Sequence, residues 1–287
     1  MGKFIIAVHG GASESSPFLK KNEKNVKACL TQAVNEAYHL LEQGNSALDA
    51  VEMAVKILED NPLFNAGRGS ALNCNGKVEM DASIMNGRTL AAGAICMVTC
   101  VKNPISLARL VMEKTAHVLL SGYGALEFAE QEKIALEAED YFIAEHQVDE
   151  LQALKHGTVG AVALDKAGNL AAATSTGGTC KSLPGRVGDS CIIGAGCYAN
   201  NKSCAVSGTG EGEYLIRGVV ANTIALMVER NMSIEEASKH VIFERNPLGG
   251  EMGVISVDSK GDLGISFNTE IMKRAWKSSD GLFDVKI

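Results

Sequence analysis

The feature that most constrains the fold is a polar stretch in the middle of the chain that leads into an apolar run. Residues 131–155 are rich in Glu, Gln and Lys and contain no Gly or Pro. Residues 158–164 then read TVGAVAL, and a short apolar run bounded by turn residues is typical of a buried strand. The pattern predicts an exposed, partly helical linker over 131–157, which is the best candidate for a boundary within the chain.

Hydrophobic periodicity on both sides of this linker predicts strands and helices in groups. Before it we expect a strand at 4–8 that ends in a turn at 9–11, helices at 25–43 and 47–58, strands at 78–85 and 91–101, and helices at 105–113 and 124–132. After it we expect strands at 158–164, 170–176, 191–193 and 204–207, helices at 213–230 and 233–245, and two last strands at 253–257 and 263–267. Helices in pairs, rather than one per strand, favour a layered α+β fold over a doubly wound sheet.

Charge and apolar content exclude several classes of partner. The net charge of −7 argues against nucleic-acid and membrane-surface partners, because both attract basic proteins. The basic cluster at 20–24 is interrupted by Glu23 and indicates a solvated face. No apolar stretch approaches the ~20 residues of a membrane span. The first residues lack the apolar length of a signal peptide and the Ser or Thr of a myristoylation motif, so we expect a cytoplasmic protein.

The eight cysteines include no CxxC pair, and the six histidines do not fall at ligand spacing beside them. We therefore expect buried free thiols rather than disulfides or a zinc site. Cys96 and Cys100 are expected on one face of a single strand.

Cleavage of the Gly157–Thr158 bond would create a reactive group. If this bond were cut, Thr158 would carry a free α-amine beside its hydroxyl. An α-amine has a reference pKa of about 7.7–8, so it could take the proton of its own Oγ near neutral pH. Gly-Thr is a common dipeptide, so the case depends on its neighbours.

Three further polar clusters follow within about fifty residues, at 174–178, 185–190 and 207–212. Arg186 offers a planar fork that suits a carboxylate, and Asp189 suits an ammonium group. Thr209 and the Gly210 amide suit a developing oxyanion. Gly-rich turns and an Arg-x-x-Asp surface ion pair remain open as plainer readings. The GTGEG sequence at 208–212 does not have the spacing of a dinucleotide fingerprint.

Several long motifs together resemble the plant-type asparaginase/isoaspartyl peptidase family of N-terminal-nucleophile hydrolases. They are HGGA at 9–12, PLFNAG at 62–67, DASIMNG at 81–87, HGTVGAVALD at 156–165, ATSTGG at 173–178, GRVGDS at 185–190, GAGCYANN at 194–201 and FNTE at 267–270. The resemblance covers nearly the whole chain apart from the linker. It implies a four-layer αββα sandwich, in which an α-subunit portion (1–157) and a β-subunit portion (158–287) form one structural domain. It also implies self-cleavage between Gly157 and Thr158.

The resemblance implies a role for each matching residue. Thr158 would be the nucleophile, Thr176 the hydroxyl that tunes its proton transfer, and Thr209 with Gly210 the oxyanion hole. Arg186 would bind the substrate α-carboxylate and Asp189 its α-amine, with Gly212 lining the pocket. Asn65 and Gly11 would support the cleavage site. The expected substrates are L-asparagine and β-aspartyl dipeptides, and the processed units are expected to form a homodimer.

The loop at 58–68 resembles a segment that wraps a structural sodium ion through backbone carbonyls, and a plain loop is an equal alternative. The ligands implied for Na⁺ or K⁺ are Leu58, Glu59, Asn61, Phe64, Ala66 and Arg68, and no catalytic cofactor is expected. Two departures from the family are the short linker and His156. A glycosylasparaginase-like hydrolase is disfavoured by Gly178 and by the lack of a signal peptide. A catalytically dormant, unprocessed paralogue is the alternative from another class.

Overall fold

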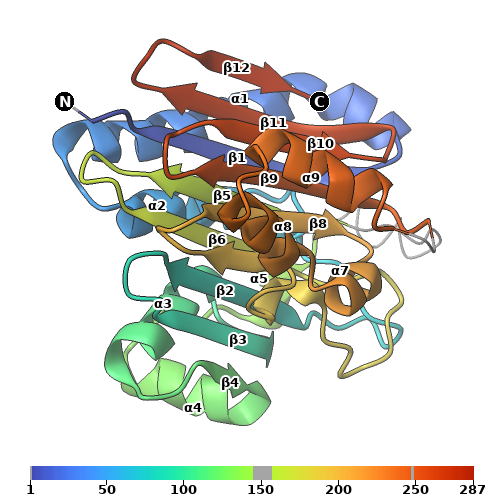
Figure 1. Cartoon of the computed structure of the whole chain (residues 1–287). Helices are drawn as coiled ribbons and strands as arrows, with labels where there is room; N and C mark the ends of the chain where they lie inside the picture. The colour runs from blue at the N-terminus through green and yellow to red at the C-terminus, as the bar shows by residue number, and fades with distance from the viewer. Residues whose placement is uncertain (1, 145–156, 247–248) are drawn as a thin grey trace.

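The computed structural model describes residues 2–144, 157–246 and 249–287, and two β-sheets dominate it (Figure 1). The larger sheet has eight strands in the order β12-β11-β1-β5-β6-β2-β3-β4. Their bounds are Ile5–Ser13 (β1), Met80–Asn86 (β2), Ala92–Val98 (β3), Leu119–Ser121 (β4), Val159–Leu164 (β5), Leu170–Thr176 (β6), Ile271–Ser278 (β11) and Phe283–Lys286 (β12). The smaller sheet has the order β10-β9-β8-β7, with bounds Cys197–Ala199 (β7), Cys204–Gly210 (β8), Met252–Asp258 (β9) and Leu263–Phe267 (β10).

Helices contact both sheets. Those in contact with the larger sheet are α1 (Pro17–Gln43), α2 (Ala47–Glu59), α3 (Pro104–Lys114) and α4 (Gly122–Gln131). Those in contact with the smaller sheet are α7 (Gly212–Gly218), α8 (Val220–Glu229) and α9 (Ile234–Phe243). The structure also contains α5 (Glu139–Phe142) and two 3₁₀ turns, η1 (Gly67–Gly69) and η2 (Asp189–Cys191). The mixed α+β class predicted from the sequence is confirmed.

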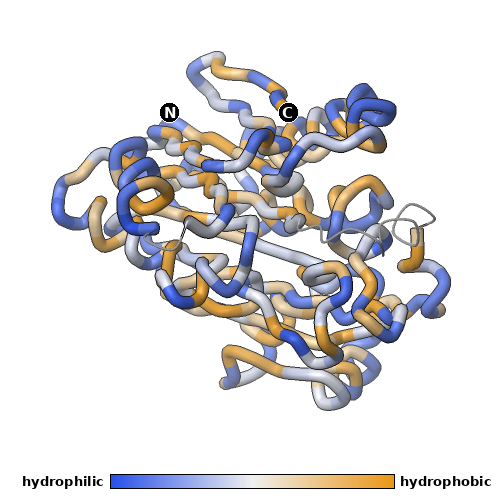
Figure 2. Tube along the Cα trace, turned by 90° about the vertical axis from the view of Figure 1, so that its right-hand side faces the viewer, coloured by the Kyte–Doolittle hydropathy of each residue, from blue (hydrophilic) through white to orange (hydrophobic). Residues whose placement is uncertain are grey.

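Three buried clusters hold these elements together. One lies between α1–α3 and the larger sheet and includes Leu30, Val51 and Ile105. A second, around Ile5, Val162 and Ile255, joins the two sheets because β1 and β5 face β8 and β9. A third lies under α8 and α9. Many hydrophilic segments lie in peripheral helices and loops (Figure 2), as burial of apolar surface requires.

Strands β5 and β6 position the Gly157–Thr158 bond. They form an antiparallel hairpin whose turn begins at Asp165, and β5 also pairs with β1. Val159 lies opposite Ser175, so the first residues of β5 lie beside the last residues of β6. The scissile bond proposed from the sequence therefore lies at one end of two central strands.

Several helix boundaries follow local signals. Ser46 and Asp49 form a capping box at the start of α2, and Ser233 and Glu236 form another at the start of α9. Gly44 ends α1 in the left-handed conformation, as expected. However, α1 begins at Pro17 rather than at residue 25, because the Ser16 side chain accepts a hydrogen bond from the Leu19 amide and caps the helix there.

Three predicted elements differ in the structure. The expected turn at 9–11 is instead part of β1, which continues to Ser13 across a register shift between His9 and Ala12. The expected strand at 191–193 does not form, because Cys191 ends the turn η2 and Ile193 makes only an isolated bridge with Cys197, the first residue of β7. The helix predicted over 213–230 divides at Val219, whose φ of 44° is left-handed, because the next amides bond to the carbonyls of residues 194 and 195.

The final strands β11 and β12 were not predicted. In β11 the buried positions are Met272, Ala275 and Ser278, which are spaced by three rather than by two. Lys273, Arg274 and Lys277 interrupt the apolar alternation that marks a strand in the sequence.

The described part of the predicted linker is partly packed. Phe142 is fully buried, and Leu136 forms an isolated bridge with Val101. Residues 145–156, which include His156 and the rest of the predicted linker, lie outside the described residues.

The cysteines are free, and six of the eight are buried, while Cys74 is exposed and Cys100 is half-buried. The expectation that Cys96 and Cys100 share a strand face is wrong, because β3 ends at Val98. Among the helices of the described residues, none has the length and apolar character of a bilayer span.

Candidate active site

The hydroxyl of Thr158 lies next to that of Thr176 at the paired ends of β5 and β6. Thr158 Oγ1 donates a hydrogen bond to Thr176 Oγ1 at 3.2 Å, and both residues are almost fully buried. Thr176 Oγ1 in turn donates to the Gly157 carbonyl oxygen at 2.9 Å and accepts from the Gly178 amide at 3.1 Å. One hydroxyl therefore links the candidate nucleophile to the carbonyl that precedes it.

Asn65 supplies a second donor to the same carbonyl. Its Nδ2 donates to Gly157 O at 2.8 Å and to Gly178 O at 2.7 Å. Its Oδ1 accepts from the Ala71 amide at 2.7 Å, which fixes the side-chain amide in one orientation. Two donors at 2.8 and 2.9 Å draw electron density from the Gly157 carbonyl carbon and would stabilise negative charge on its oxygen.

Gly11 lies against the same peptide bond. Its φ of 100° is left-handed, and a Cβ there would lie 3.2 Å from Gly157 Cα and 3.3 Å from Thr158 N. The position therefore favours glycine both for its backbone conformation and for its close approach. The irregular segment of β1 therefore packs directly against Gly157 and Thr158, between which cleavage is expected.

Arg186, Asp189 and Gly212 face one space. A Cβ at Gly212 would lie 2.7 Å from Asp189 Oδ1 and 2.9 Å from Arg186 Nη2, so the missing side chain leaves room between the two charges. Asp189 is 3% exposed, and its Oδ2 is a buried atom without a hydrogen-bond partner among the described residues. Burial raises the pKa of Asp189 to about 7, although the nearby Arg186 opposes the shift. In its ionised form this buried carboxylate suits a cationic ligand group.

Glu213 orients Arg186 and was missed from the sequence. Arg186 Nε donates to Glu213 Oε1 at 2.9 Å and Nη2 donates to Oε2 at 3.0 Å, a bidentate ion pair. The plainer reading of Arg186 and Asp189 as a surface ion pair does not describe this contact, because the guanidinium bonds to Glu213. The sequence signal was an acidic residue directly after Gly212, at the start of a helix.

Thr209 and Gly210 lie on β8 of the smaller sheet and approach the site from the other side. Thr209 is fully buried, and its Oγ1 accepts a 3.4 Å hydrogen bond from the Ala12 amide. Gly210 has a φ of 120°, and a Cβ there would overlap the Glu251 carbonyl oxygen. Because Ala12 follows Gly11 in the bulge, the structure brings Thr209 to the residues beside Thr158.

A buried hydrogen-bond network near the site contains a histidine and a serine side chain, as the catalytic pairs of serine hydrolases do. His9 Nε2 lies 2.9 Å from Ser207 Oγ, which lies 2.7 Å from Thr174 Oγ1. Burial lowers the pKa of His9 to about 3, so the imidazole is neutral. All three residues are fully buried, and a Cβ at Gly160 would overlap both His9 and Ser207. The pair is therefore closed to a substrate.

In the loop at 58–68, where the resemblance implies a cation site, backbone carbonyl oxygens lie close to two glycines. A Cβ at Gly67, where φ is 53°, would lie 2.5 Å from the Glu59 carbonyl oxygen, and one at Gly69 would overlap the Phe64 carbonyl oxygen. The Glu59 carboxyl is buried, and Oε1 accepts from Ser175 Oγ and the Ile105 amide. Oε2 has no partner among the described residues. Burial raises the pKa of Glu59 to about 8, so this carboxyl is largely protonated at neutral pH, and a cation in the loop would depend on its backbone oxygens.

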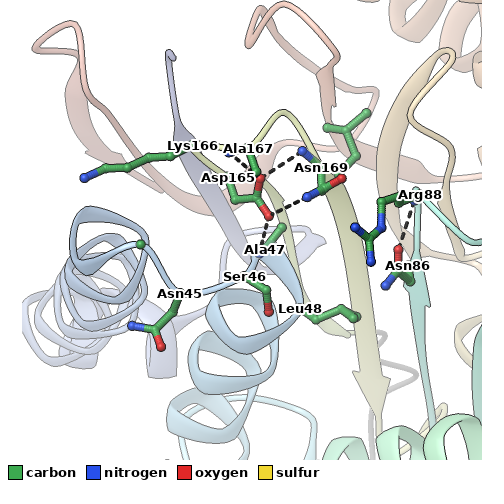
Figure 3. Close-up of a pocket in the computed structure, with 12 residues that line it drawn as sticks. Asn45, Ser46, Ala47, Leu48, Asn86, Arg88, Asp165, Lys166, Ala167 and Asn169 are labelled. Atoms are coloured by element: carbon green, nitrogen blue, oxygen red, sulfur yellow. Dashed lines mark hydrogen bonds between the residues drawn. The ribbon is translucent and has the colours of Figure 1, made fainter. Parts of the chain in front are cut away.

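A separate hollow of about 450 Å³ lies at the other end of β5 and β6 (Figure 3). Lys166, Arg88 and Asp165 line it, but the Asp165 carboxylate already accepts hydrogen bonds from the main chain. Asp165 accepts hydrogen bonds from the amides of Ala47, Ala167 and Asn169 at 3.2, 2.9 and 2.9 Å. These contacts tie the β5–β6 turn to the start of α2, so the residue acts in the fold.

Comparisons with known proteins agree with the motifs. The family model described as Asparaginase matches residues 2–156 and 149–287. The isoaspartyl peptidase of Salmonella typhimurium is 45% identical over an alignment of 299 positions, which covers 96% of each chain. The isoaspartyl peptidase/L-asparaginase of Homo sapiens is 44% identical, with 90% of this chain and 88% of the human chain covered. The probable isoaspartyl peptidase/L-asparaginase 2 of Arabidopsis thaliana is 38% identical over 100% of this chain and 99% of its own. The family model matches both halves of the chain, and the relatives are 38–45% identical over most of its length. The chain therefore belongs to the asparaginase family that includes the isoaspartyl peptidases.

Proposed function

We propose that the protein is a threonine-type amidohydrolase that cuts itself between Gly157 and Thr158. It then hydrolyses L-asparagine to aspartate and ammonia, and β-aspartyl dipeptides to aspartate and an amino acid. The hydrogen-bonded series from Thr158 Oγ1 through Thr176 Oγ1 to Gly157 O carries the proposal. The relatives, which are named as isoaspartyl peptidases and L-asparaginases, support the substrate class.

In the cleavage step, Thr158 Oγ1 attacks the Gly157 carbonyl carbon and the C–N bond breaks. The oxygen that becomes negative is held by Asn65 Nδ2 and Thr176 Oγ1, which already donate to it. The proton from the hydroxyl passes to the leaving nitrogen, which becomes the α-amine of Thr158. Water then opens the ester, and a free N-terminal threonine remains.

In the hydrolytic step, the new α-amine takes the proton of Thr158 Oγ1, which attacks the side-chain amide of the substrate. Arg186 binds the α-carboxylate of the substrate and Asp189 its ammonium group, so the amino acid is held by both charged ends. Thr209 and Gly210 stabilise the oxyanion, and Gly212 leaves room for the substrate between the charges. Ammonia or an amino acid leaves, and water releases aspartate from the ester.

Other features follow from the same family. We infer the four-layer αββα sandwich, because helices contact both sheets and a buried cluster joins the sheets. Residues 1–157 and 158–287 would be the two subunits after cleavage, and two processed units would form a homodimer. The six buried thiols support a reducing compartment such as the cytoplasm. No observation favours the glycosylasparaginase or the dormant paralogue.

Aspartate release from L-asparagine and from β-Asp-Leu tests the substrate class. Fully cleaved protein should hydrolyse at least one of them, and protein active on neither would contradict the proposal. The Arg186→Ala variant should still cut itself but should show a sharply raised KM. An unchanged KM would refute the carboxylate role of Arg186.

The cation site is tested through stability. Na⁺ or K⁺ should raise the melting temperature of the protein at constant ionic strength relative to a tetramethylammonium salt. Gly67→Ala, which places a Cβ against the Glu59 carbonyl, should remove this difference. Equal melting temperatures in all three salts would contradict the site.

A further inference from the structure

A cluster of three metal-ligating side chains lies beside the segment that carries Arg186 and Asp189. Asp81 from β2, Cys96 from β3 and Cys191 from the end of η2 each offer one ligand atom, and these atoms all lie within 4.8 Å of one another. The exposed fractions of the three residues are 2%, 5% and 2%. The cluster takes no part in the reaction proposed above.

The fold builds this cluster with two irregularities. The pairing of β2 with β3 shifts register between Met80 and Ala82, so Asp81 falls within the irregular step. Met97, directly after Cys96, has a left-handed φ of 59°, and its amide donates to Asp81 Oδ1 at 3.1 Å. A left-handed non-glycine residue is uncommon and is often found at functional sites.

Asp81 is fixed by the main chain but keeps capacity to bind a cation. Its Oδ1 accepts from Met97, and its Oδ2 accepts from the Gly188 amide at 3.0 Å. An ionised carboxylate has about four lone-pair sites, so each oxygen retains one. Backbone donors that orient a ligating carboxylate are typical of the surroundings of protein metal sites.

The two thiols supply soft ligands. Zn–S and Zn–O distances of about 2.3 and 2.0–2.2 Å place tetrahedral ligands roughly 3.4–3.8 Å apart. The observed separations, all within 4.8 Å, therefore require only a small contraction.

The charge balance also suits a divalent cation. Zn²⁺ would bind Asp81 and two thiolates with release of two thiol protons to solvent. The cluster then carries the same net charge of −1 as the ionised Asp81 beside two neutral thiols. Arg186 therefore experiences no new charge, although the segment at 186–191 becomes tied to β3.

We propose that Asp81, Cys96 and Cys191 form a three-ligand site for Zn²⁺ or another thiophilic divalent cation, with water as the fourth ligand. The ion joins the end of β3 to the segment that presents Arg186 and Asp189. The site differs from the hard-cation loop at 58–68 in its position and in its sulfur ligands.

Cobalt titration of the reduced full-length protein, in buffer without thiols or oxygen, tests the site. Co²⁺ should bind at one equivalent and give thiolate-to-cobalt absorption in the near ultraviolet with tetrahedral bands in the visible, and Zn²⁺ should remove both. Cys96→Ser and Cys191→Ser should each abolish or greatly weaken these bands. Cys204→Ser, which changes a buried thiol elsewhere, should leave them intact.

Native mass spectrometry of the unaltered protein with Zn²⁺ keeps the test decisive if a variant fails to fold, because one bound zinc per chain is expected. No stoichiometric binding, or full binding by both the Cys96 and Cys191 variants, would overturn the proposal. If oxidation links Cys96 to Cys191 and the reduced protein still binds no cobalt, the pair is a redox couple and the metal site is refuted.

Discussion

Replacement of Asn65 by alanine should slow self-cleavage without preventing folding. The variant removes the Nδ2 donor that lies 2.8 Å from Gly157 O and leaves Thr176 Oγ1, at 2.9 Å, as the remaining donor to this oxygen. Both distances fall within the range of effective oxyanion donors. Loss of one such donor costs roughly 10²–10³ in rate, or about 2.7–4 kcal/mol of transition-state stabilisation.

The assay follows the precursor band by gel electrophoresis at fixed pH and temperature. The half-life of the Asn65→Ala precursor should be at least about a hundredfold longer than that of the parent. The Ala71 amide also loses its acceptor, so urea denaturation should show a loss of about 1–3 kcal/mol of stability. The assay should therefore run well below the melting temperature.

Two variants separate the donor role from a general effect. Asn65→Asp keeps an acceptor for Ala71 but places a negative charge against two carbonyl oxygens, so it should cleave more slowly still. Asn75→Ala, in an exposed turn that has no contact with the Gly157 carbonyl among the described hydrogen bonds, should cleave at the parent rate. Cleavage of Asn65→Ala within about threefold of the parent rate would refute the reasoning.

Three further predictions concern the clamp for the amino acid. Glu213→Gln weakens the bidentate orientation of Arg186, so KM for L-asparagine should rise roughly 3–10-fold while the precursor cleaves at its normal rate; an unchanged KM would contradict the positioning role. Gly212→Ala places a Cβ 2.7 Å from Asp189 Oδ1, so kcat/KM should fall by about tenfold or more with cleavage retained, and full activity would argue against a pocket there. Burial raises the pKa of Asp189 to about 7, so its binding-competent carboxylate forms only as pH rises through 7. The inhibition constant for L-aspartate should therefore fall over pH 6–8 and then level off, and a constant value over this range would refute the role of Asp189.

The elements with strong local signals could be predicted from the sequence. The stripe of small apolar residues and the capping box at Ser46 fix α2 almost to the residue, and Gly44 ends α1. The break at Val219 could not be predicted in this way. It depends on amides of α8 that bond to a loop some 27 residues earlier, which is tertiary information.

The candidate site shows the same division. Thr158, Thr176 and Arg186 could be predicted as site residues because each lies in a distinctive sequence motif. Asn65, which donates a hydrogen bond to the Gly157 carbonyl, is 92 residues away in the sequence. This contact depends on how the loop after α2 folds back. Asp81 begins the DASIMNG motif and Glu213 directly follows the cluster at 207–212, but neither could be assigned a role from the sequence. Glu213 meets Arg186, and Asp81 meets Cys96 and Cys191, only because separate segments approach one another in the fold.

Self-cleavage between Gly157 and Thr158 is tested most directly by measuring the intact mass of the purified protein over time. Scaling the 30.2 kDa chain by residue number gives fragments of about 16.5 and 13.7 kDa, and N-terminal sequencing of the smaller one should begin at Thr158. The account predicts that both fragments accumulate in the parent and that Thr158→Ala stays whole. A parent chain that persists at full mass, or a Thr158→Ala variant that still yields both fragments, would contradict the account.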